Sequence, residues 1–366
     1  MSEQVTPGAA AEAEAGTGSS FEARLNQADK SVASFERDDH TFAHIARNFL
    51  RYNPTLVPAI VLLASILVFG AIAPRFMTPG VLSTIMQQVT VTGFVALAQT
   101  LIILTAGIDL SVGAVMVICA LIMGRLSVLT GMPVPMAIMV GMFFGGLMGW
   151  FNGFLVAKVK LPPFIVTLGT LSIFTALKLW YSHSESIRNA DIEEVAPMLL
   201  WFGTDIKFMG ATITYGVVAL IVLATILWFV LNHTAWGRHV HAVGDDPEAA
   251  TLSGIRTDRV LISVYAVAGV ILGFAAWVSI GRVGSVNPIS FDTINLASIT
   301  AVVIGGTSLF GGRGSIIGSV LGAFIVQVFT TGLSLARVDD YWQQFAAGIL
   351  VIVAVTLDQQ LRRASK

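Results

Sequence analysis

One carboxylate, Asp109, lies inside an apolar stretch of this chain, with the hydroxyl of Ser111 two residues further on. A charged group surrounded by apolar residues is costly, so it usually faces water, a partner group or a substrate path. The alternative is that Asp109 caps a helix that begins at Leu110, because aspartate accepts hydrogen bonds from the free N–H groups of a first turn. Both roles are compatible if that helix begins inside the protein.

Uncharged amides and hydroxyls also lie within the apolar stretches. Moving a hydroxyl out of water without a new hydrogen bond costs roughly 2–7 kcal/mol, so a path for a polar solute needs such groups. Hydrogen bonding between neighbouring helices is the ordinary alternative for each of them. The candidates for a path are Asp109 and Ser111 together with Gln87, Gln99, Asn152, Thr167 and Thr170, and Gln88 and Gln327 are further polar residues of this kind.

The segment 244–255 (GDDPEAATLSGI) lies between two long apolar runs and is typical of a short capped helix. Asp246 can cap it, and Pro247 suits the first helical position, where a missing N–H has no consequence. Glu248 then falls in the first turn, where the helix dipole favours an acidic residue. Gly254 can end the helix, because glycine readily adopts the left-handed backbone conformation that follows a last helical turn.

These signals predict a helix over 247–253, of about two turns, which is too short to be stable alone in water. Ala249 and Ala250 give this helix a flat, narrow side, and charged residues follow it closely. A short capped helix between membrane spans predicts a contact with another subunit.

The residues that several kinds of chemistry require are absent from the sequence. The sequence contains no Gly-x-x-x-x-Gly-Lys-Ser/Thr motif, so the chain does not bind ATP through a loop of that type. His239 and His241 flank one residue but have no evident third ligand nearby, and no metal or other cofactor is expected. A cluster of embedded titratable groups for a proton relay is also missing, as is any nucleophile–base pair, so we do not expect an enzyme.

Composition places the chain in a membrane. Hydrophobic residues make up 55% of it and charged residues only 12%, whereas soluble domains carry about 25% charged residues. The mean hydropathy is +0.79. The net charge of −1 gives no indication of a nucleic-acid partner.

A helix needs roughly 20 mainly apolar residues to cross a bilayer. The chain therefore predicts an all-α polytopic membrane protein with about ten such helices. They are expected near 55–73, 84–106, 108–130, 133–156, 163–182, 212–231, 260–281, 295–310, 314–335 and 341–358.

Lysine and arginine indicate the orientation, because they are enriched in cytoplasmic loops. Most of the 21 basic residues face the cytoplasm when both termini are placed inside. Residues 1–40 then form a disordered cytoplasmic tail, 41–53 an interfacial amphipathic helix, and 54–360 the transmembrane domain. The segment 232–259 becomes a cytoplasmic loop that contains the short capped helix.

Glycines recur at four-residue spacing along three of the expected helices, which allows neighbouring backbones to approach closely. Static close packing is one interpretation, and helices that slide during gating is the other. The series are Gly141, Gly145, Gly149 and Gly153, then Gly269 and Gly273, then Gly314, Gly318 and Gly322.

Over roughly residues 50–362, the chain resembles the membrane permeases of bacterial ABC importers for monosaccharides, the ribose, xylose, arabinose and galactose group. The motifs that carry this resemblance are 107–113 (GIDLSVG), 161–170 (LPPFIVTLGT), Glu248-Ala249-Ala250 with Gly254-Ile255, and 301–312 (AVVIGGTSLFGG). Within the group, the segments 182–188 and 234–238 look most like fructose-type permeases.

The resemblance implies a multi-pass protein of the bacterial inner membrane that works as a homodimer with separate ATP-binding subunits and a periplasmic sugar-binding protein. The helix 247–253 would be the coupling helix, with Asp246, Pro247, Glu248, Ala249, Ala250 and Gly254 at the ATPase contact. The binding protein is expected to dock near Arg188, Arg282 or Arg337. An ion-coupled secondary transporter is the alternative function, although that class of transporter does not account for the capped helix.

Overall fold

The computed structural model describes residues 55–208 and 211–363. The chain divides into two units, Met1–Asn53 and Pro54–Lys366, and the fold below is that of the second. The predicted tail (1–40) and interfacial helix (41–53) lie outside the described residues.

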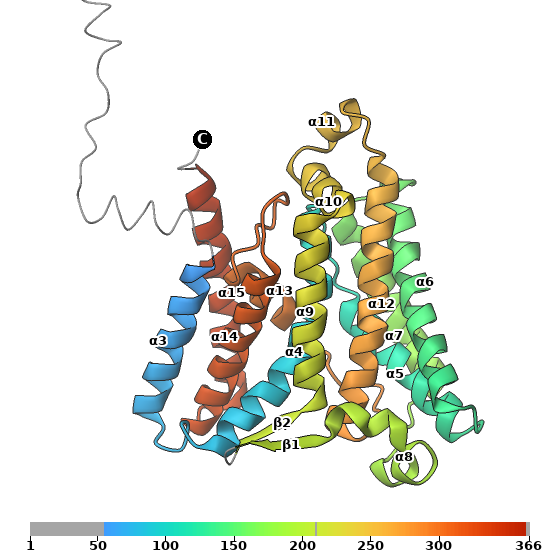
Figure 1. The fold of residues 1–366 in the computed structure, drawn as a ribbon, viewed down its shortest axis with the longest axis vertical. Helices are drawn as coiled ribbons and strands as arrows, with labels where there is room; N and C mark the ends of the chain where they lie inside the picture. Colours follow the sequence, from blue (N-terminus) through green and yellow to red (C-terminus); the bar gives the residue numbers. More distant parts are fainter. Residues whose placement is uncertain (1–54, 209–210, 364–366) are drawn as a thin grey trace, which may run out of the picture. The chain divides into compact units, whose positions relative to one another are not determined.

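The second unit is mostly helical (Figure 1). Its helices are α3 (Leu56–Ile72), α4 (Pro79–Leu104), α5 (Val112–Val128), α6 (Val134–Ala157), α7 (Pro163–Ser182), α8 (Asn189–Val195), the 3-10 helix η1 (Pro197–Gly203), α9 (Tyr215–His233), α10 (Ala235–Asp245), α11 (Pro247–Leu252), α12 (Thr257–Val283), α13 (Ile294–Ile304), α14 (Ile316–Leu335) and α15 (Asp340–Arg363). The strands β1 (Asp205–Phe208) and β2 (Ala211–Thr214) form an antiparallel pair that the all-α prediction missed.

Among the described residues, six helices are long and apolar enough to cross a membrane: α4, α6, α7, α9, α12 and α14. α3, α5 and α13 are shorter apolar helices. The helical, multi-pass character predicted from the sequence is therefore confirmed, whereas the count of ten spans and the cytoplasmic termini stay predictions.

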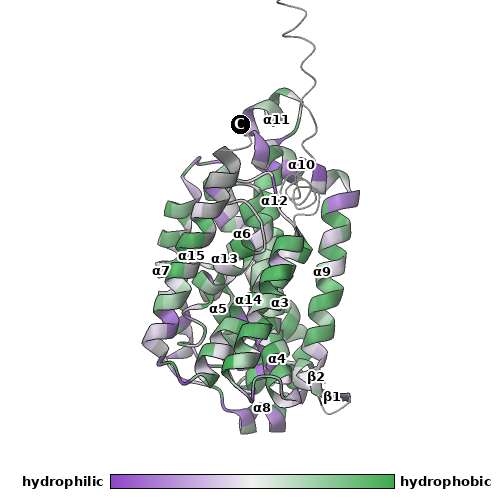
Figure 2. Cartoon of the chain, turned by 90° about the vertical axis from the view of Figure 1, so that its left-hand side faces the viewer, coloured by the Kyte–Doolittle hydropathy of each residue, from purple (hydrophilic) through white to green (hydrophobic). Residues whose placement is uncertain are grey.

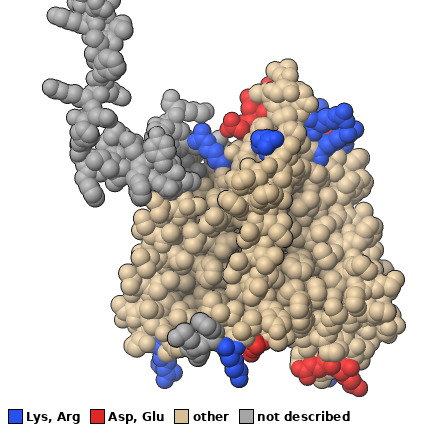
Figure 3. Space-filling view, in the orientation of Figure 1, with Lys and Arg blue, Asp and Glu red and all other residues tan. Residues whose placement is uncertain are grey.

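The outer surface of the helices is apolar, and polar residues gather at the two ends of the bundle (Figure 2). Charged side chains likewise lie at these ends, with an uncharged belt between them on the face drawn in Figure 3. We call the ends the α11 end, where α10 and α11 lie, and the α8 end, where α8, β1 and β2 lie (Figure 1). A belt that exposes Phe143, Ile221 and Trp180 suits contact with lipid.

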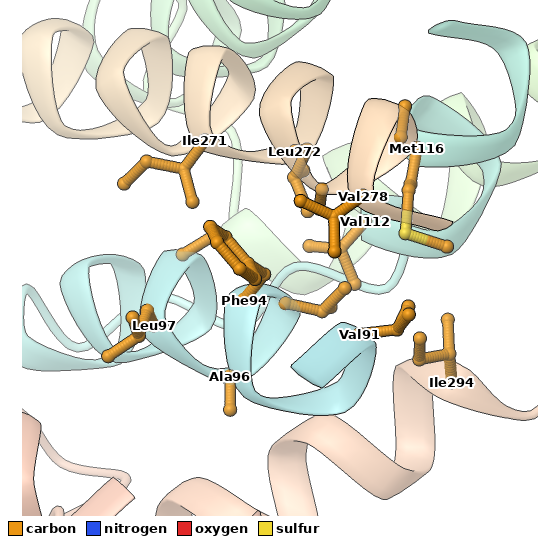
Figure 4. Packing of buried hydrophobic residues seen from close by; sticks show 14 of the residues in the cluster. Val91, Phe94, Ala96, Leu97, Val112, Met116, Ile271, Leu272, Val278 and Ile294 are labelled. Atoms are coloured by element: carbon orange, nitrogen blue, oxygen red, sulfur yellow. The ribbon is translucent and has the colours of Figure 1, made fainter. Parts of the chain in front are cut away.

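The core is built around α4, whose residues from Val89 to Leu104 are all buried. A helix that is apolar on every side needs neighbours on every side, and α12, α13, α14 and α9 pack around α4. Figure 4 shows Phe94 of α4 pointing toward α12, where Ile271 and Leu272 lie, and Val91 of α4 beside Ile294 of α13.

Helices α6 and α12 approach one another through glycine. A Cβ on Gly149 would meet the carbonyl group of Tyr265, and one on Gly145 would meet the backbone of Gly269. The four-residue spacing seen in the sequence therefore corresponds to backbone contact. Whether these helices also slide remains a prediction.

Two predicted spans are shorter than the apolar runs that contain them. α5 begins at Val112 and α13 ends at Ile304, so residues 105–111 and 305–315 are irregular. At their first turns the two helices meet, because the N–H of Gly113 donates to Oδ1 of Asn295 at 2.7 Å. α13 has 11 residues, about 16 Å, and so covers only part of a hydrocarbon core of about 30 Å.

Candidate coupling site and translocation path

The helix α11 is built as its local sequence requires. Oδ1 of Asp246 accepts hydrogen bonds from the N–H groups of Glu248 at 2.9 Å and Ala249 at 3.0 Å. Pro247 occupies the first position, and Gly254 has a φ of +84° just beyond the last turn. The helix ends at Leu252, one residue earlier than predicted, with Ser253 as its C-terminal cap.

The exposed face of α11 differs from the one expected. Glu248 and Ala249 are exposed, but Ala250 is buried, so only one of the two alanines can face a partner. Leu252 is 90% exposed, the highest value among the large hydrophobic side chains of the described residues. It lies at the polar α11 end rather than in the lipid-facing belt, and the sequence prediction did not include it.

Charges surround this protrusion but leave its tip bare (Figure 3). Asp245 and Glu248 are exposed on its N-terminal side, and Arg256 and Arg259 follow its C-terminal side. Such an arrangement offers an apolar contact with charged groups at its rim, which is the usual anatomy of a protein–protein interface.

The predicted loop 232–259 contains a second helix, α10, which carries α11. Oγ1 of Thr234 caps α10 by accepting the N–H of Gly237 at 3.2 Å. Nε1 of Trp236 donates to Oγ of Ser263 at 2.9 Å and so attaches α10 to α12. α11 therefore stands on a packed helix rather than on a free loop.

Four of the predicted path residues come together inside the bundle. Both the N–H and the hydroxyl of Ser111 donate to Oδ1 of Asp109 at 2.6 Å. Nδ2 of Asn152 donates to Oγ of Ser111 at 3.0 Å and to Oδ2 of Asp109 at 3.4 Å. Oγ1 of Thr167 donates to the carbonyl of Ile108 at 3.0 Å. We call these residues the Asp109 cluster.

Asp109 does not cap a helix that begins at Leu110, as the sequence analysis had allowed. The helix begins at Val112, and the carboxylate instead accepts the N–H two residues ahead of it, in an aspartate turn. The cluster is closed to solvent, and Oδ1 of Asn152 and the hydroxyl of Tyr265 have no hydrogen-bond partner in the described structure. In this conformation the cluster joins the start of α5 to α6 and α7.

The other path candidates lie apart from this cluster or at its edge. Thr170 is one turn beyond Thr167 on α7, with its hydroxyl 3.4 Å from the Thr167 carbonyl. Gln87 is partly buried on α4. Gln99 is fully buried on the same helix, and neither of its amide atoms has a hydrogen-bond partner among the described residues.

Two further glutamines bond to neighbouring helices. Nε2 of Gln327 donates to Oγ1 of Thr92 at 2.7 Å, and Oγ1 of Thr331 donates to Oε1 of Gln88 at 3.2 Å. Both pairs join α4 to α14. The ordinary alternative, hydrogen bonding between helices, therefore accounts for these two residues.

The three arginines expected at a binding-protein contact all belong to the α8 end. Arg188 precedes α8 and is exposed, Arg282 is in the last turn of α12 and is half-buried, and Arg337 follows α14 and is exposed. A fourth basic group, which was not predicted from the sequence, lies here. Nζ of Lys178, whose side chain is only 4% exposed, lies 3.2 Å from Oδ1 of Asp292 and holds α7 to the segment before α13.

These features define a multi-pass helical membrane protein, with an apolar outer surface, buried polar groups inside the bundle and a capped helix at one end. The family profile described as the permease component of a branched-chain amino acid transport system matches residues 81–355. The chain belongs to this family and, within it, to the ABC permeases for monosaccharides. Its family implies ATPase and substrate-binding partners.

Several curated relatives are sugar permeases, and the similarity to this chain covers nearly their full length. The fructose import permease of Rhizobium meliloti is 48% identical over 94% of this chain and 96% of its own. The ribose import permease of Bacillus subtilis (strain 168) is 33% identical over 83% and 92%. The D-allose permease of Escherichia coli (strain K12) is 32% identical over 86% and 93%. No solved structure matches the chain.

Proposed function

We propose that this chain is the permease subunit of an ATP-driven importer that carries fructose across the bacterial inner membrane. Support for fructose comes from the 48% identity to a fructose import permease, compared with 33% and 32% for permeases of ribose and allose. Two copies of the chain would form the translocation unit with two ATPase subunits.

The observation that carries the ATP-driven mechanism is the protruding helix α11. Its cap, its exposed faces and the bare apolar tip at Leu252 leave it ready for a partner. The chain has no phosphate-binding loop of its own, so a separate ATPase would supply the energy through this contact. Asp246, Pro247, Glu248, Ala249 and Gly254 would shape the docking helix, and Ala250 would seat it on the permease.

At the opposite end, Arg188, Arg282 and Arg337 would receive a periplasmic sugar-binding protein through acidic groups on that protein. The Asp109 cluster and Gln99 would come to line the path when the bundle opens. Their hydroxyl, amide and carboxylate groups match the hydrogen-bonding needs of a sugar. An unpaired buried amide such as that of Gln99 is expensive unless another conformation gives it a partner.

We expect uptake of labelled fructose in cells that depend on this permease to collapse with vanadate, which blocks ABC-type ATP hydrolysis. A protonophore applied while ATP is maintained should leave most of the uptake intact. Initial rates with fructose and with ribose, measured beside a deletion strain, make the test. Uptake that survives vanadate but stops with the protonophore would establish the ion-coupled alternative instead.

A further inference from the structure

Three segments that are far apart in the sequence meet beneath α10. They are the end of α4 at Leu104, the C-terminal half of α10 at His241 and Gly244, and the loop between α13 and α14 at Gly311 and Gly312. We call this contact the α10 seat. It lies directly under α11, because α11 follows α10 after a single residue.

Hydrogen bonds connect the three parts of the seat. The N–H of Gly312 donates to the carbonyl of Leu104 at 3.0 Å. Nδ1 of His241 lies 3.1 Å from the carbonyl of Gly312, so this ring nitrogen donates there. Gly312 thus bonds to α4 through its N–H and to α10 through its carbonyl.

The parts also touch backbone to backbone. A Cβ on Gly244 would collide with the carbonyl of Leu104, and a Cβ on Gly312 would lie 2.9 Å from the Cα of Asp245. Gly311 and Gly312 have φ values of +83° and +74°, which glycine adopts without strain. Because no flexible side chain separates these backbones, a shift of α10 must move its neighbours.

Each of the two segments that contact α10 is continuous with a short helix, either α5 or α13. The chain runs from Leu104 through residues 105–111 into α5, and the loop 305–315 is the direct continuation of α13. The first turn of α5, which residues 105–111 enter, is joined to the first turn of α13, at the end of α13 away from the loop 305–315, by the hydrogen bond from Gly113 to Asn295. The α10 seat, the two irregular segments and the two short helices therefore form a closed circuit of contacts.

We propose that His241 and Gly244 are positioning residues that transmit the displacement of α11 to α5 and α13, and so couple ATP hydrolysis to opening of the path. This inference rests on the proposed function, because it takes the ATPase as the source of the displacement. α10 moves as a rigid helix, and the α10 seat is the contact through which its movement reaches the membrane domain.

The test uses the full complex of permease, ATPase and sugar-binding protein in proteoliposomes, with four permease variants. His241→Leu removes the N–H donor, His241→Asn keeps a donor near the position of Nδ1, and Gly244→Ala forces α10 away from Leu104. Gly169→Ala is the matched control, because a Cβ at Gly169 on α7 has no heavy atom within 4 Å.

His241→Leu adds no backbone collision, so it should still assemble with the ATPase and hydrolyse ATP at the basal rate. Gly244→Ala places a carbon against the carbonyl of Leu104, so it should also reduce the amount of assembled complex, and its coupling is measured per assembled complex. The sugar transported per ATP should fall about tenfold, in keeping with the loss of one partly buried hydrogen bond. His241→Asn should recover most of the coupling, and Gly169→Ala should behave as wild type. The ratio of sugar transported to ATP hydrolysed distinguishes a loss of coupling from a loss of folded protein, because a loss of folded protein lowers transport and hydrolysis together.

Wild-type coupling in both His241→Leu and Gly244→Ala would overturn the inference. A parallel loss of assembly, hydrolysis and transport in His241→Leu would also overturn it, since it would assign the seat a purely structural role. Failure of the proposed function has a different signature: the wild-type permease itself would neither bind an ATPase nor transport sugar with ATP.

Discussion

Replacing Leu252 with aspartate is expected to weaken binding of the ATPase at least about tenfold and to reduce ATP-driven transport to the same extent. Full burial of a leucine contributes roughly 1.5–3 kcal/mol, and an aspartate would bring an unpaired charge into the same apolar contact. Because Leu252 is 90% exposed, the substitution removes no packing within the permease. Co-purification and uptake assays on the same membranes measure both effects.

Two variants control for this prediction. Leu252→Met keeps an apolar side chain of similar volume and should bind nearly as wild type. Val195→Asp makes a comparable change at an exposed aliphatic residue of α8, at the opposite end of the bundle, and should leave ATPase binding unchanged. Normal assembly of Leu252→Asp with the ATPase would contradict the assignment of this residue to the contact.

Replacing Gly149 with valine is expected to abolish the folded permease. The added carbon would meet the carbonyl of Tyr265 on α12, and backbone cannot move aside as a side chain can. Overpacking a well-packed core typically costs about 1–3 kcal/mol, and a backbone collision along the α6–α12 contact should exceed this range. The yield of monodisperse protein after detergent extraction reports the result.

Gly169→Val is the control for that experiment, because the Cβ position of Gly169 is open. It changes the same residue type to the same side chain within a membrane helix. Equal yields of the Gly149 and Gly169 variants would show that α6 and α12 are not in backbone contact in the membrane. A folded Gly149→Val protein that has lost transport would favour sliding helices over static packing.

Local signals in the sequence were sufficient for α11. A capping aspartate, a proline at the first position and a glycine stop act within a few residues of one another, and the helix forms where they indicate. The long apolar helices could also be predicted from the sequence, because their length and apolar composition identify them. The glycine series also indicated a real backbone contact, because four-residue spacing places Gly145 and Gly149 on one face.

Contacts between distant segments decided what the sequence could not indicate. The apolar runs 108–130 and 295–310 look like complete spans, but α5 begins only at Val112 and α13 ends at Ile304, and their first turns meet through the hydrogen bond between Gly113 and Asn295. The ion pair of Lys178 and Asp292 joins residues 114 apart. The spacing of Ala249 and Ala250 likewise gave no means of telling which one faces inward.

The most direct test of ATP-driven transport through α11 is reconstitution of the purified permease in proteoliposomes, alone and with its ATPase and sugar-binding protein. We predict that labelled fructose accumulates against its gradient only when all three proteins and ATP are present, and that Leu252→Asp abolishes this accumulation. Accumulation by the permease alone, driven by an imposed ion gradient, would contradict ATP-driven transport through α11.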